Sequence, residues 1–414
     1  MMQQTIHRAR YVLADPYTVI PDGGIRILDD DRIADVAGWS RFSKDTSVSV
    51  VDWGDAIILP GFVNTHAHLE LTDFQSRLNR YTSFTNWLSQ LITQRRAWNM
   101  ETLVSSIHKG IALSLSSGTT TVGDISSMGI ATSAAANDSL RKVIFKESIA
   151  LSPSQAGQNI AEMERALDST ESSDLSFKGI SPHAPYTVSG KLYGGLAELS
   201  SNRNIPLATH IAETEAEIEF LQKGSGEFRD FLQAINALPS DWHPPGLSPI
   251  SYLHSLGVLG PLCILIHCNY LDWESIATIA DSGSSIVYCP RSHDFFGHSK
   301  HPVRKLLDAG INVALGTDSL ASNNSLSMLD EMRYLYGKRN DLKPEEILMA
   351  TTANGAQALH LTTGQLKPGY WADLTVLEVP SNLKGSKIPA QILEGAGTCI
   401  GTVIGGKTAW RRDS

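Results

Sequence analysis

The middle of the chain alternates short apolar runs with amphipathic stretches, the pattern of strands that each lead into a helix. Eight such strand–helix units over roughly 270 residues match a (β/α)8 barrel in count and in length. The predicted strands lie at residues 58–63, 119–125, 142–150, 178–184, 205–211, 263–268, 284–289 and 312–318. Predicted helices between them include residues 101–116, 158–168, 189–201, 272–281, 303–309 and 325–338.

The two ends of the chain have a different pattern, in which apolar and polar residues alternate between Pro, Gly and Asp turn signals. Segments such as TIHRARYVL near the start and ADLTVLEV near the end are typical of short strands. Two strand-rich ends predict one small β domain that both termini build. We therefore expect a β-sandwich from residues 1–56 and 362–414, attached to a barrel at residues 57–361.

Residues 222–250 are longer than a usual connection from helix to strand. They contain Gly, Pro and aromatic residues and follow a predicted strand. We expect an inserted loop over the mouth of the barrel, which could act as a lid.

The composition excludes several classes of protein. At 414 residues and 42% hydrophobic, the chain is long enough to bury a large core. The net charge of -9 comes without a long run of one sign, so nucleic acid is not an expected partner. No stretch approaches the roughly 20 apolar residues of a membrane span, and no signal peptide is expected at the N-terminus.

The four cysteines form no Cys-x-x-Cys pair, which is typical of free thiols in a reducing compartment. We therefore expect a cytoplasmic protein.

Histidines and an acid stand at the ends of predicted strands, where barrel enzymes hold their reactive groups. His66 and His68 are two residues apart, so on a strand both side chains face the same side. His210 and Asp318 end two later strands. Three imidazoles and a carboxylate suit zinc or ferrous iron, with one position open for a reactive water. Only a closed barrel would bring the first and last strands together, whereas an open doubly wound sheet would not.

Three of the strand-end residues have alternative interpretations. Glu213 could receive the water's proton as a general base, or could be a solvated acid that caps the next helix. His267 could hydrogen-bond the attacking water, or could be an ordinary core histidine. Asp318 could cap the following helix, although Ser319 and Ser322 are available as caps.

The sequence His68-Leu69-Glu70 also fits half of the zinc signature of the small cytidine deaminases. That signature requires a later Pro-Cys-x-x-Cys, which the chain lacks. We therefore exclude that class.

Several motifs are spread over nearly the whole chain. They are LPGFVNTHAHLE (59–70), SPHAPYTVS (181–189), THIAETEAE (209–217), HCNYL (267–271), CPRSHDFFGH (289–298), VALGTDSLASNNSLSMLDEMR (313–333) and LKPGYWADLTVL (366–377). Together these motifs resemble the amidohydrolase superfamily. The resemblance implies a barrel that hydrolyses carbon–nitrogen bonds, flanked by a β-sandwich from both termini. Within the superfamily the sequence is most similar to the mononuclear aminohydrolases, which deaminate purine-like rings.

The resemblance implies one divalent metal ion, with Zn2+ expected and Fe2+ as the alternative. A second ion would usually be bridged by a lysine on the fourth strand, where Lys178 lies near the wrong end. Lys146 and Glu147 on the third strand are the remaining candidates for a bridge. The implied metal ligands are His66, His68, His210 and Asp318, and the implied catalytic residues are Glu213, His267 and Asp318.

The implied substrate is an adenine-type nucleoside. Deaminases of thioether adenosines carry a ribose-binding acid before a Trp-Leu pair, and Asn86 stands at that place here. Glu70 and the run 290–293 instead resemble the aminodeoxyfutalosine deaminases, whose substrate bears an aromatic carboxylate. Arg291, His293 or His298 could face that carboxylate. The implied substrate-binding residues are His183, Glu70, Trp87, Arg291 and His293.

Two other classes of protein are alternatives. A hydrolase of the same fold could act on guanine, cytosine, a triazine or a cyclic amide. A non-catalytic scaffold would have lost metal ligands, and here none is missing. Homodimers are common among similar proteins, so a homodimer is a further expectation.

Overall fold

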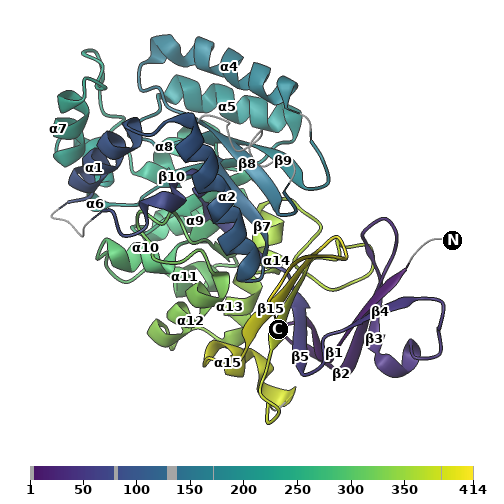
Figure 1. Cartoon of the computed structure of the whole chain (residues 1–414). Helices are drawn as coiled ribbons and strands as arrows, with labels where there is room; N and C mark the ends of the chain where they lie inside the picture. The colour runs from purple at the N-terminus through teal and green to yellow at the C-terminus, as the bar shows by residue number, and fades with distance from the viewer. Residues whose placement is uncertain (1–3, 79–82, 128–137, 171, 384, 414) are drawn as a thin grey trace.

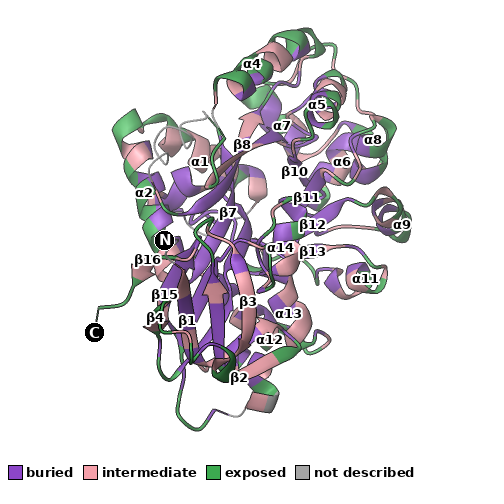
Figure 2. Ribbon diagram, turned by 90° about the vertical axis from the view of Figure 1, so that its right-hand side faces the viewer, coloured by how far each residue is buried: buried purple, intermediate pink, exposed green. Residues whose placement is uncertain are grey.

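The computed structural model describes residues 4–78, 83–127, 138–170, 172–383 and 385–413. Its centre is a sheet of eight parallel strands surrounded by helices, and a second sheet lies beside it (Figure 1). The central strands are buried, whereas the helices expose their outer faces (Figure 2). The predicted combination of a (β/α)8 barrel with a β unit from both termini is confirmed.

The barrel closes between its first and last strands. Its strands are β6 (Phe62–Ala67), β7 (Thr119–Ser126), β8 (Arg141–Ser148), β9 (Ser176–Pro182), β10 (Leu207–Ile211), β11 (Cys263–His267), β12 (Ser285–Tyr288) and β13 (Val313–Leu315). The backbone N–H groups of Thr317 and Asp318 donate to the carbonyl oxygen of His66 at 3.1 and 3.0 Å. Ala67 forms a parallel bridge with Asp318. The first and last strand ends therefore meet, as a closed barrel requires.

The second sheet is mixed and takes its strands from both ends of the chain. These are β1 (Thr5–Asp15), β2 (Thr18–Ile27), β3 (Ile33–Gly38), β4 (Ser49–Asp52), β5 (Ala56–Pro60), β14 (Leu374–Glu378), β15 (Thr398–Ile404) and β16 (Lys407–Arg411). β5 pairs with β1 and with β14, which joins the N-terminal strands to the C-terminal ones. Ile25, Trp53 and Val376 belong to one buried cluster between them. The division of the chain into units at residues 56 and 361 stays a prediction.

The prediction of one strand at residues 58–63 was wrong, because this run belongs to two sheets. β5 ends at Pro60 in the terminal sheet, and β6 begins at Phe62 in the barrel. Gly61 lies between them, where a Cβ would lie 2.1 Å from Thr120 Oγ1. Both strands are buried, so a continuous apolar run does not reveal the passage from one sheet to the other.

The six predicted helices are present, with ends that differ by at most three residues. The helices of the barrel are α1 (Phe84–Arg96), α2 (Met100–Ser116), α4 (Ala156–Ser169), α5 (Gly190–Arg203), α6 (Glu215–Lys223), α7 (Glu227–Ala234), α8 (Pro249–Ser255), α9 (Trp273–Ser282), α10 (Pro290–Phe295), α11 (Val303–Asp308), α12 (Met328–Lys338), α13 (Pro344–Ala350) and α14 (Ala353–Ala358), and α15 (Ile388–Leu393) follows β14. The side chains of Ser189, Asp272 and Ser327 cap α5, α9 and α12 by accepting a backbone N–H. Among the described residues, no helix has the length and hydropathy to cross a membrane.

Residues 222–250 contain the helix α7, so the prediction of a loop was wrong for this part. Gly226 precedes the helix with φ 87°, a conformation that favours glycine. Phe228, Phe231 and Leu232 are buried, which gives the short helix one apolar face. The Gly and Pro residues around it obscured this face in the sequence. A lid movement of this segment stays a prediction.

Arg141 and Asp373 join the barrel to the terminal sheet through a buried ion pair. Arg141 Nε and Nη2 donate to the Asp373 carboxylate at 2.7 and 2.9 Å. The two side chains are 1% and 0% exposed. The same carboxylate accepts from Thr363 Oγ1 and from the Gly405 N–H, each at 2.9 Å. Since a buried charge without a partner is costly, this pair holds the two sheets in one arrangement.

Asp373→Asn should lower the free energy of unfolding by about 3–5 kcal/mol, because it leaves the Arg141 guanidinium buried beside a neutral amide. Urea unfolding measures this change. The exposed pair of Arg203 and Asp168 provides the control, and Asp168→Asn should leave the unfolding midpoint unchanged. Equal midpoints for the two variants would contradict the role of the buried pair.

His7 holds the two ends of the chain together in its neutral form. Trp53 Nε1 donates to His7 Nδ1 at 3.2 Å, so the ring proton is on Nε2. That nitrogen lies 3.2 Å from the carbonyl oxygen of Gly406, between β15 and β16. Burial lowers the pKa of His7 to about 4, and the carbonyl oxygen of Gly406 opposes this shift only in part.

The stabilisation by neutral His7 should be complete above pH 6.5 and should be lost as the pH falls to about 4, because only the unfolded chain binds the proton in that interval. The free energy of unfolding of His7→Gln should lack this loss. As the pH falls from 7 to 4, the wild type should therefore lose about 3 kcal/mol more unfolding free energy than the variant.

Urea unfolding at a series of pH values measures this difference. His254 is exposed on α8, so His254→Gln should follow the wild-type pH dependence. A difference between wild type and His7→Gln that does not change with pH would show that His7 is not the titrating group.

Candidate metal centre and active site

Three histidines converge at the C-terminal ends of the barrel strands. The rings of His66 and His68 have centroids 4.9 Å apart. The ring centroid of His210, from β10, lies 5.0 Å from that of His66. One nitrogen from each ring lies within 4.8 Å of the other two. Because zinc–nitrogen bonds are about 2.1 Å long, one metal ion fits between these nitrogens.

The surroundings of His210 and His66 leave ring nitrogens available to a metal ion. His210 Nδ1 lies 3.0 Å from the carbonyl oxygen of His183, so Nδ1 carries the proton and Nε2 is free to bind an ion. Both ring nitrogens of His66 are buried, and within the described structure neither has a hydrogen-bond partner. A buried, unpaired nitrogen costs about 1–3 kcal/mol, which a bound ion would relieve.

Asp318 adds a carboxylate whose two oxygens have different surroundings. Its Oδ1 lies 3.5 Å from His66 Nε2 and 3.6 Å from His68 Nε2. Its Oδ2 accepts hydrogen bonds from Ser292 Oγ at 2.7 Å and from Ser322 Oγ at 2.6 Å. The two serines fix the side chain through Oδ2 and leave Oδ1 facing the histidines.

Burial sets the charge of the cluster. It lowers the pKa of His68 to about 3, and it lowers the pKa of His210 well below the usual value. For Asp318 burial acts to raise the pKa, but the facing ring of His66 and its neighbours outweigh it and hold the pKa well below its usual range. Neutral imidazoles and an ionised carboxylate are the forms that bind a divalent metal. Zinc and ferrous iron both suit this donor set.

Glu213 and His267 lie next to this cluster. Glu213 Oε1 is 3.4 Å from His267 Nε2. Burial, followed by the charge of Asp318, raises the pKa of Glu213 well above its usual value. Glu213 is only 5% exposed, and the side chain of Thr214 caps α6 in its place. A buried carboxyl with a high proton affinity can accept a proton and release it again.

The backbone at the barrel mouth is bent where the reactive residues lie. Ala212, His267, Cys268 and Asp318 have φ angles of 50°, 74°, 53° and 59°, in the left-handed region. Each such residue outside glycine costs on the order of 1 kcal/mol and persists only where contacts hold it. For His267 the contact is His301, whose Nε2 lies 2.9 Å from its carbonyl oxygen.

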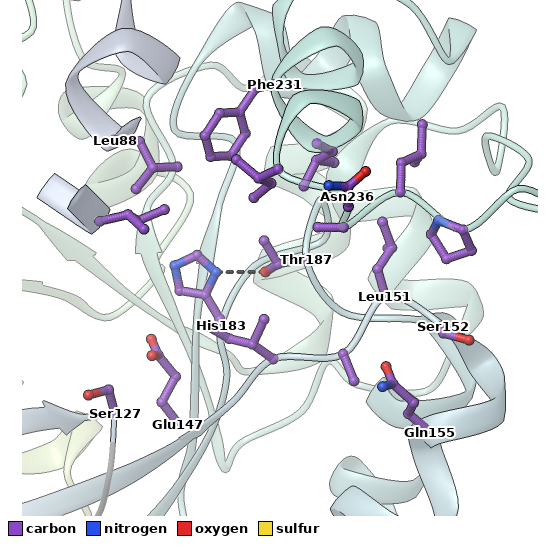
Figure 3. Close-up of a pocket in the computed structure, with 18 of the residues that line it drawn as sticks. Leu88, Ser127, Glu147, Leu151, Ser152, Gln155, His183, Thr187, Phe231 and Asn236 are labelled. Carbon is purple, nitrogen blue, oxygen red and sulfur yellow. Dashed lines mark hydrogen bonds between the residues drawn. The ribbon is translucent and has the colours of Figure 1, made fainter. Parts of the chain in front are cut away.

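A cavity of about 1020 Å³ opens beside the cluster and is lined by His68, Glu70 and His183. Figure 3 shows Glu147 and Ser127 on one side of His183, and Leu88 and Phe231 on the other. The first side is polar, whereas α1 and α7 supply an apolar wall. The cavity therefore offers a ligand two chemically different surfaces next to the metal ligands.

The expected substrate-binding residues fall into two groups. Glu70 and His183 line the cavity, and the Glu70 carboxylate accepts from Ser127 Oγ at 2.5 Å. Trp87 is buried in an aromatic cluster instead, where its Nε1 lies 3.4 Å from the carbonyl oxygen of Ala321. The role of Trp87 in substrate binding stays a prediction.

Arg291 and His293 lie on α10 and line smaller cavities. The Arg291 guanidinium lies over the ring of Tyr334, with its Cζ 5.6 Å from the centroid. His293 is 8% exposed and its ring contacts that of Tyr288. Neither residue lines the cavity beside His183, and their expected role in substrate binding stays a prediction.

Several residues of the site escaped the sequence interpretation. Ser292 and Ser322 hold the Asp318 carboxylate, whereas the sequence indicated Ser322 only as an available helix cap and gave Ser292 no role of its own. Glu217 is buried and its carboxylate accepts the backbone N–H groups of Ala212 and Glu213 at 2.9 Å each. The Thr214-x-x-Glu217 spacing was a usable signal, because a Glu three residues after a Thr cap turns its carboxylate back toward the backbone N–H groups before the helix. Nothing local indicated His301.

Comparison with known proteins agrees with this geometry. Residues 57–409 match the model of the amidohydrolase family. The 5'-deoxyadenosine deaminase of Methanothermobacter thermautotrophicus is 30% identical over 376 residues, covering 87% of this chain and 82% of that protein. The 5-methylthioadenosine/S-adenosylhomocysteine deaminase of Caldicellulosiruptor saccharolyticus is 28% identical, covering 91% and 85%.

Solved structures share the whole fold. The aminofutalosine deaminase of Helicobacter pylori in complex with methylthio-coformycin aligns with a TM-score of 0.88 at 24% identity, covering 98% of this chain and 99% of that one. An adenosine deaminase from Xanthomonas campestris with bound zinc aligns with a TM-score of 0.83 at 23% identity, covering 98% and 92%.

The chain belongs to the amidohydrolase family. Because the chain matches this family and is similar to deaminases, the protein is a hydrolase that acts on carbon–nitrogen bonds other than peptide bonds. Its His66, His68 and His210 form a group that could hold a metal ion.

Purified protein should contain about one divalent ion per chain by elemental analysis, since the cluster has room for one ion. His210→Ala should remove most of it, because the variant loses a ligand whose geometry the His183 carbonyl fixes. His254→Ala, at the exposed α8 position, should retain the wild-type metal content. Full metal content in His210→Ala would contradict the site.

Proposed function

We propose that this protein is a hydrolytic deaminase of an adenine-type nucleoside, with one divalent ion, expected to be zinc. The observation that carries the proposal is the meeting of His66, His68, His210 and Asp318 beside the pair Glu213–His267, at one end of a large cavity. The deaminase names of relatives at 30% and 28% identity favour an aminated purine over a triazine or a cyclic amide.

When bound, the divalent ion would lower the pKa of a bound water molecule, so that this water becomes a nucleophile near neutral pH. Glu213 accepts a proton at its carboxylate and passes it to a ring nitrogen of the substrate. His267 Nε2, 3.4 Å from Glu213 Oε1, orients the attacking water and stabilises the oxyanion that develops on the ring carbon. Asp318 takes the remaining proton of the attacking water from the hydroxyl group of the adduct and passes it to the exocyclic amine, so the carbon–nitrogen bond breaks and ammonia leaves.

The cavity favours a nucleoside with a small or apolar group at its 5′ position. Leu88, Phe231 and Leu238 offer apolar surface away from the metal ligands. Arg95 is the one cation among the described residues that line the cavity, and its Nη2 lies 3.6 Å from Glu70. A substrate carboxylate such as that of 6-amino-6-deoxyfutalosine would have to compete with Glu70 for Arg95.

An ammonia-release screen tests the proposal. It compares 5'-deoxyadenosine, 5-methylthioadenosine, S-adenosylhomocysteine and 6-amino-6-deoxyfutalosine with guanine, cytosine and a triazine. The expected result is ammonia from the adenine nucleosides, with the absorbance shift of an inosine-like product. Ammonia or chloride from the other heterocycles alone would overturn the proposal.

Glu213→Gln should retain the metal but lose roughly two or more orders of magnitude in kcat, because an amide cannot move the proton. Elemental analysis and steady-state kinetics on the same preparation measure both. Glu215 is exposed two residues later, so Glu215→Gln is the matched control and should have wild-type kcat. Near-normal turnover of Glu213→Gln would refute its role.

The cytoplasmic location, the homodimer and the lid movement of residues 222–250 are kept as predictions. The roles of the metal ligands and catalytic residues are likewise proposals, which the two variant experiments at Glu213 and His210 test separately.

A further inference from the structure

Glu147 is a carboxyl group in the cavity that the proposed reaction does not use. It lies near the C-terminal end of β8, and Figure 3 shows it with Ser127 on the same side of His183. Within the described part of the chain, its carboxyl oxygens have no hydrogen-bond or ion-pair partner. Glu147 is partly exposed and lines the cavity, so its carboxyl group is accessible to a ligand there.

The neighbouring acid has the partners that Glu147 lacks. Glu70 accepts from the Ser127 hydroxyl at 2.5 Å and from its backbone N–H at 3.3 Å, and it pairs with Arg95. Burial, followed by the charge of Glu70, raises the pKa of Glu147 to about 8, while Arg95 acts in the opposite direction. Glu147 therefore lies beside an already satisfied acid and lacks a hydrogen-bond donor.

A metal does not supply the missing partner. Among the described residues, the group with ligand atoms close enough to share one ion consists of His66, His68 and His210. Glu147 is not a member of that group, so a second ion at this carboxyl has no support from its surroundings. A ligand that fills the cavity can supply the donor in place of water.

We propose that Glu147 is a specificity-determining residue that accepts hydrogen bonds from the 2′- and 3′-hydroxyl groups of the substrate ribose. This inference rests on the proposed function. With the adenine ring beside the metal ligands and His183, the ribose is the next polar part of a nucleoside. A carboxylate has two oxygens that accept hydrogen bonds, which matches two adjacent hydroxyl donors. The apolar wall opposite receives the 5′ side.

The test compares two substrates with two forms of the metal-loaded enzyme. At pH 9, where a carboxyl group with a pKa of about 8 is mostly ionised, wild type should deaminate 5'-deoxyadenosine with a kcat/KM about 10- to 100-fold higher than 2′,3′,5′-trideoxyadenosine, the size of lost hydrogen bonds to a charged acceptor. In Glu147→Gln this ratio should fall severalfold, because the amide loses the charge and one of the two acceptor oxygens, and the change should be mainly in KM for the substrate that carries the diol. Glu164→Gln changes an exposed acid on α4 and should keep the wild-type ratio.

The outcomes separate the inference from the function on which it rests. If the wild type releases no ammonia from either nucleoside, the proposed function and the inference fall together. If it deaminates both and Glu147→Gln keeps the wild-type ratio, the inference alone is overturned. A loss of metal from Glu147→Gln would make Glu147 a metal ligand and would also overturn it.

A second variant covers a failure of Glu147→Gln to fold. Glu147→Asp keeps the charge but shortens the side chain by one methylene. Its ratio of kcat/KM for the two nucleosides should therefore lie between those of the wild type and Glu147→Gln. An unchanged ratio in Glu147→Asp would count against the inference in the same way.

Discussion

The closure of the barrel between β6 and β13 is the constraint on which the site depends. The carbonyl oxygen of His66 accepts the backbone N–H groups of both Thr317 and Asp318. Gly316 allows this approach, because a Cβ there would lie 2.9 Å from the Cβ of His66. The closure places Asp318 Oδ1 3.5 Å from His66 Nε2, although the two residues are far apart in the sequence. Without this closure, Asp318 Oδ1 would not lie beside the ring nitrogens of the histidines.

The same strand can carry stability at one end and chemistry at the other. Arg141 begins β8 and is paired with Asp373 of the terminal sheet, while Glu147 lies near the end of β8 in the cavity. This division follows the general rule for such barrels, in which the C-terminal ends of the strands hold the reactive groups. The terminal sheet therefore packs at the N-terminal end of β8, whereas the C-terminal ends of the barrel strands are left to the cavity, the loops and α7.

Burial gives each ionisable group of the site its state. It keeps the imidazole of His210 neutral and raises the pKa of Glu213, so that one is ready to bind an ion and the other to hold a proton. Asp318 stays ionised because the facing imidazoles outweigh its burial. The low dielectric of the barrel mouth is thus as important to the proposed chemistry as the identity of the side chains.

The sequence by itself determined the barrel, the two-ended β unit and the strand-end positions of His66, His210 and Asp318. These follow from local patterns: the alternation of strand and helix, and polar residues after apolar runs. It also indicated the family, because the motifs are contiguous stretches of chain.

Only the tertiary structure decided which residues meet. The passage from β5 to β6 at Gly61, the helix α7 within a Gly- and Pro-rich segment, and the placement of Arg291 outside the main cavity had no local signal. Contacts such as those of Ser292 and His301 join residues distant in the sequence. These contacts form because separate strands and loops come together at the barrel mouth. The periodicity of a single segment carries no information about which other segments it will contact.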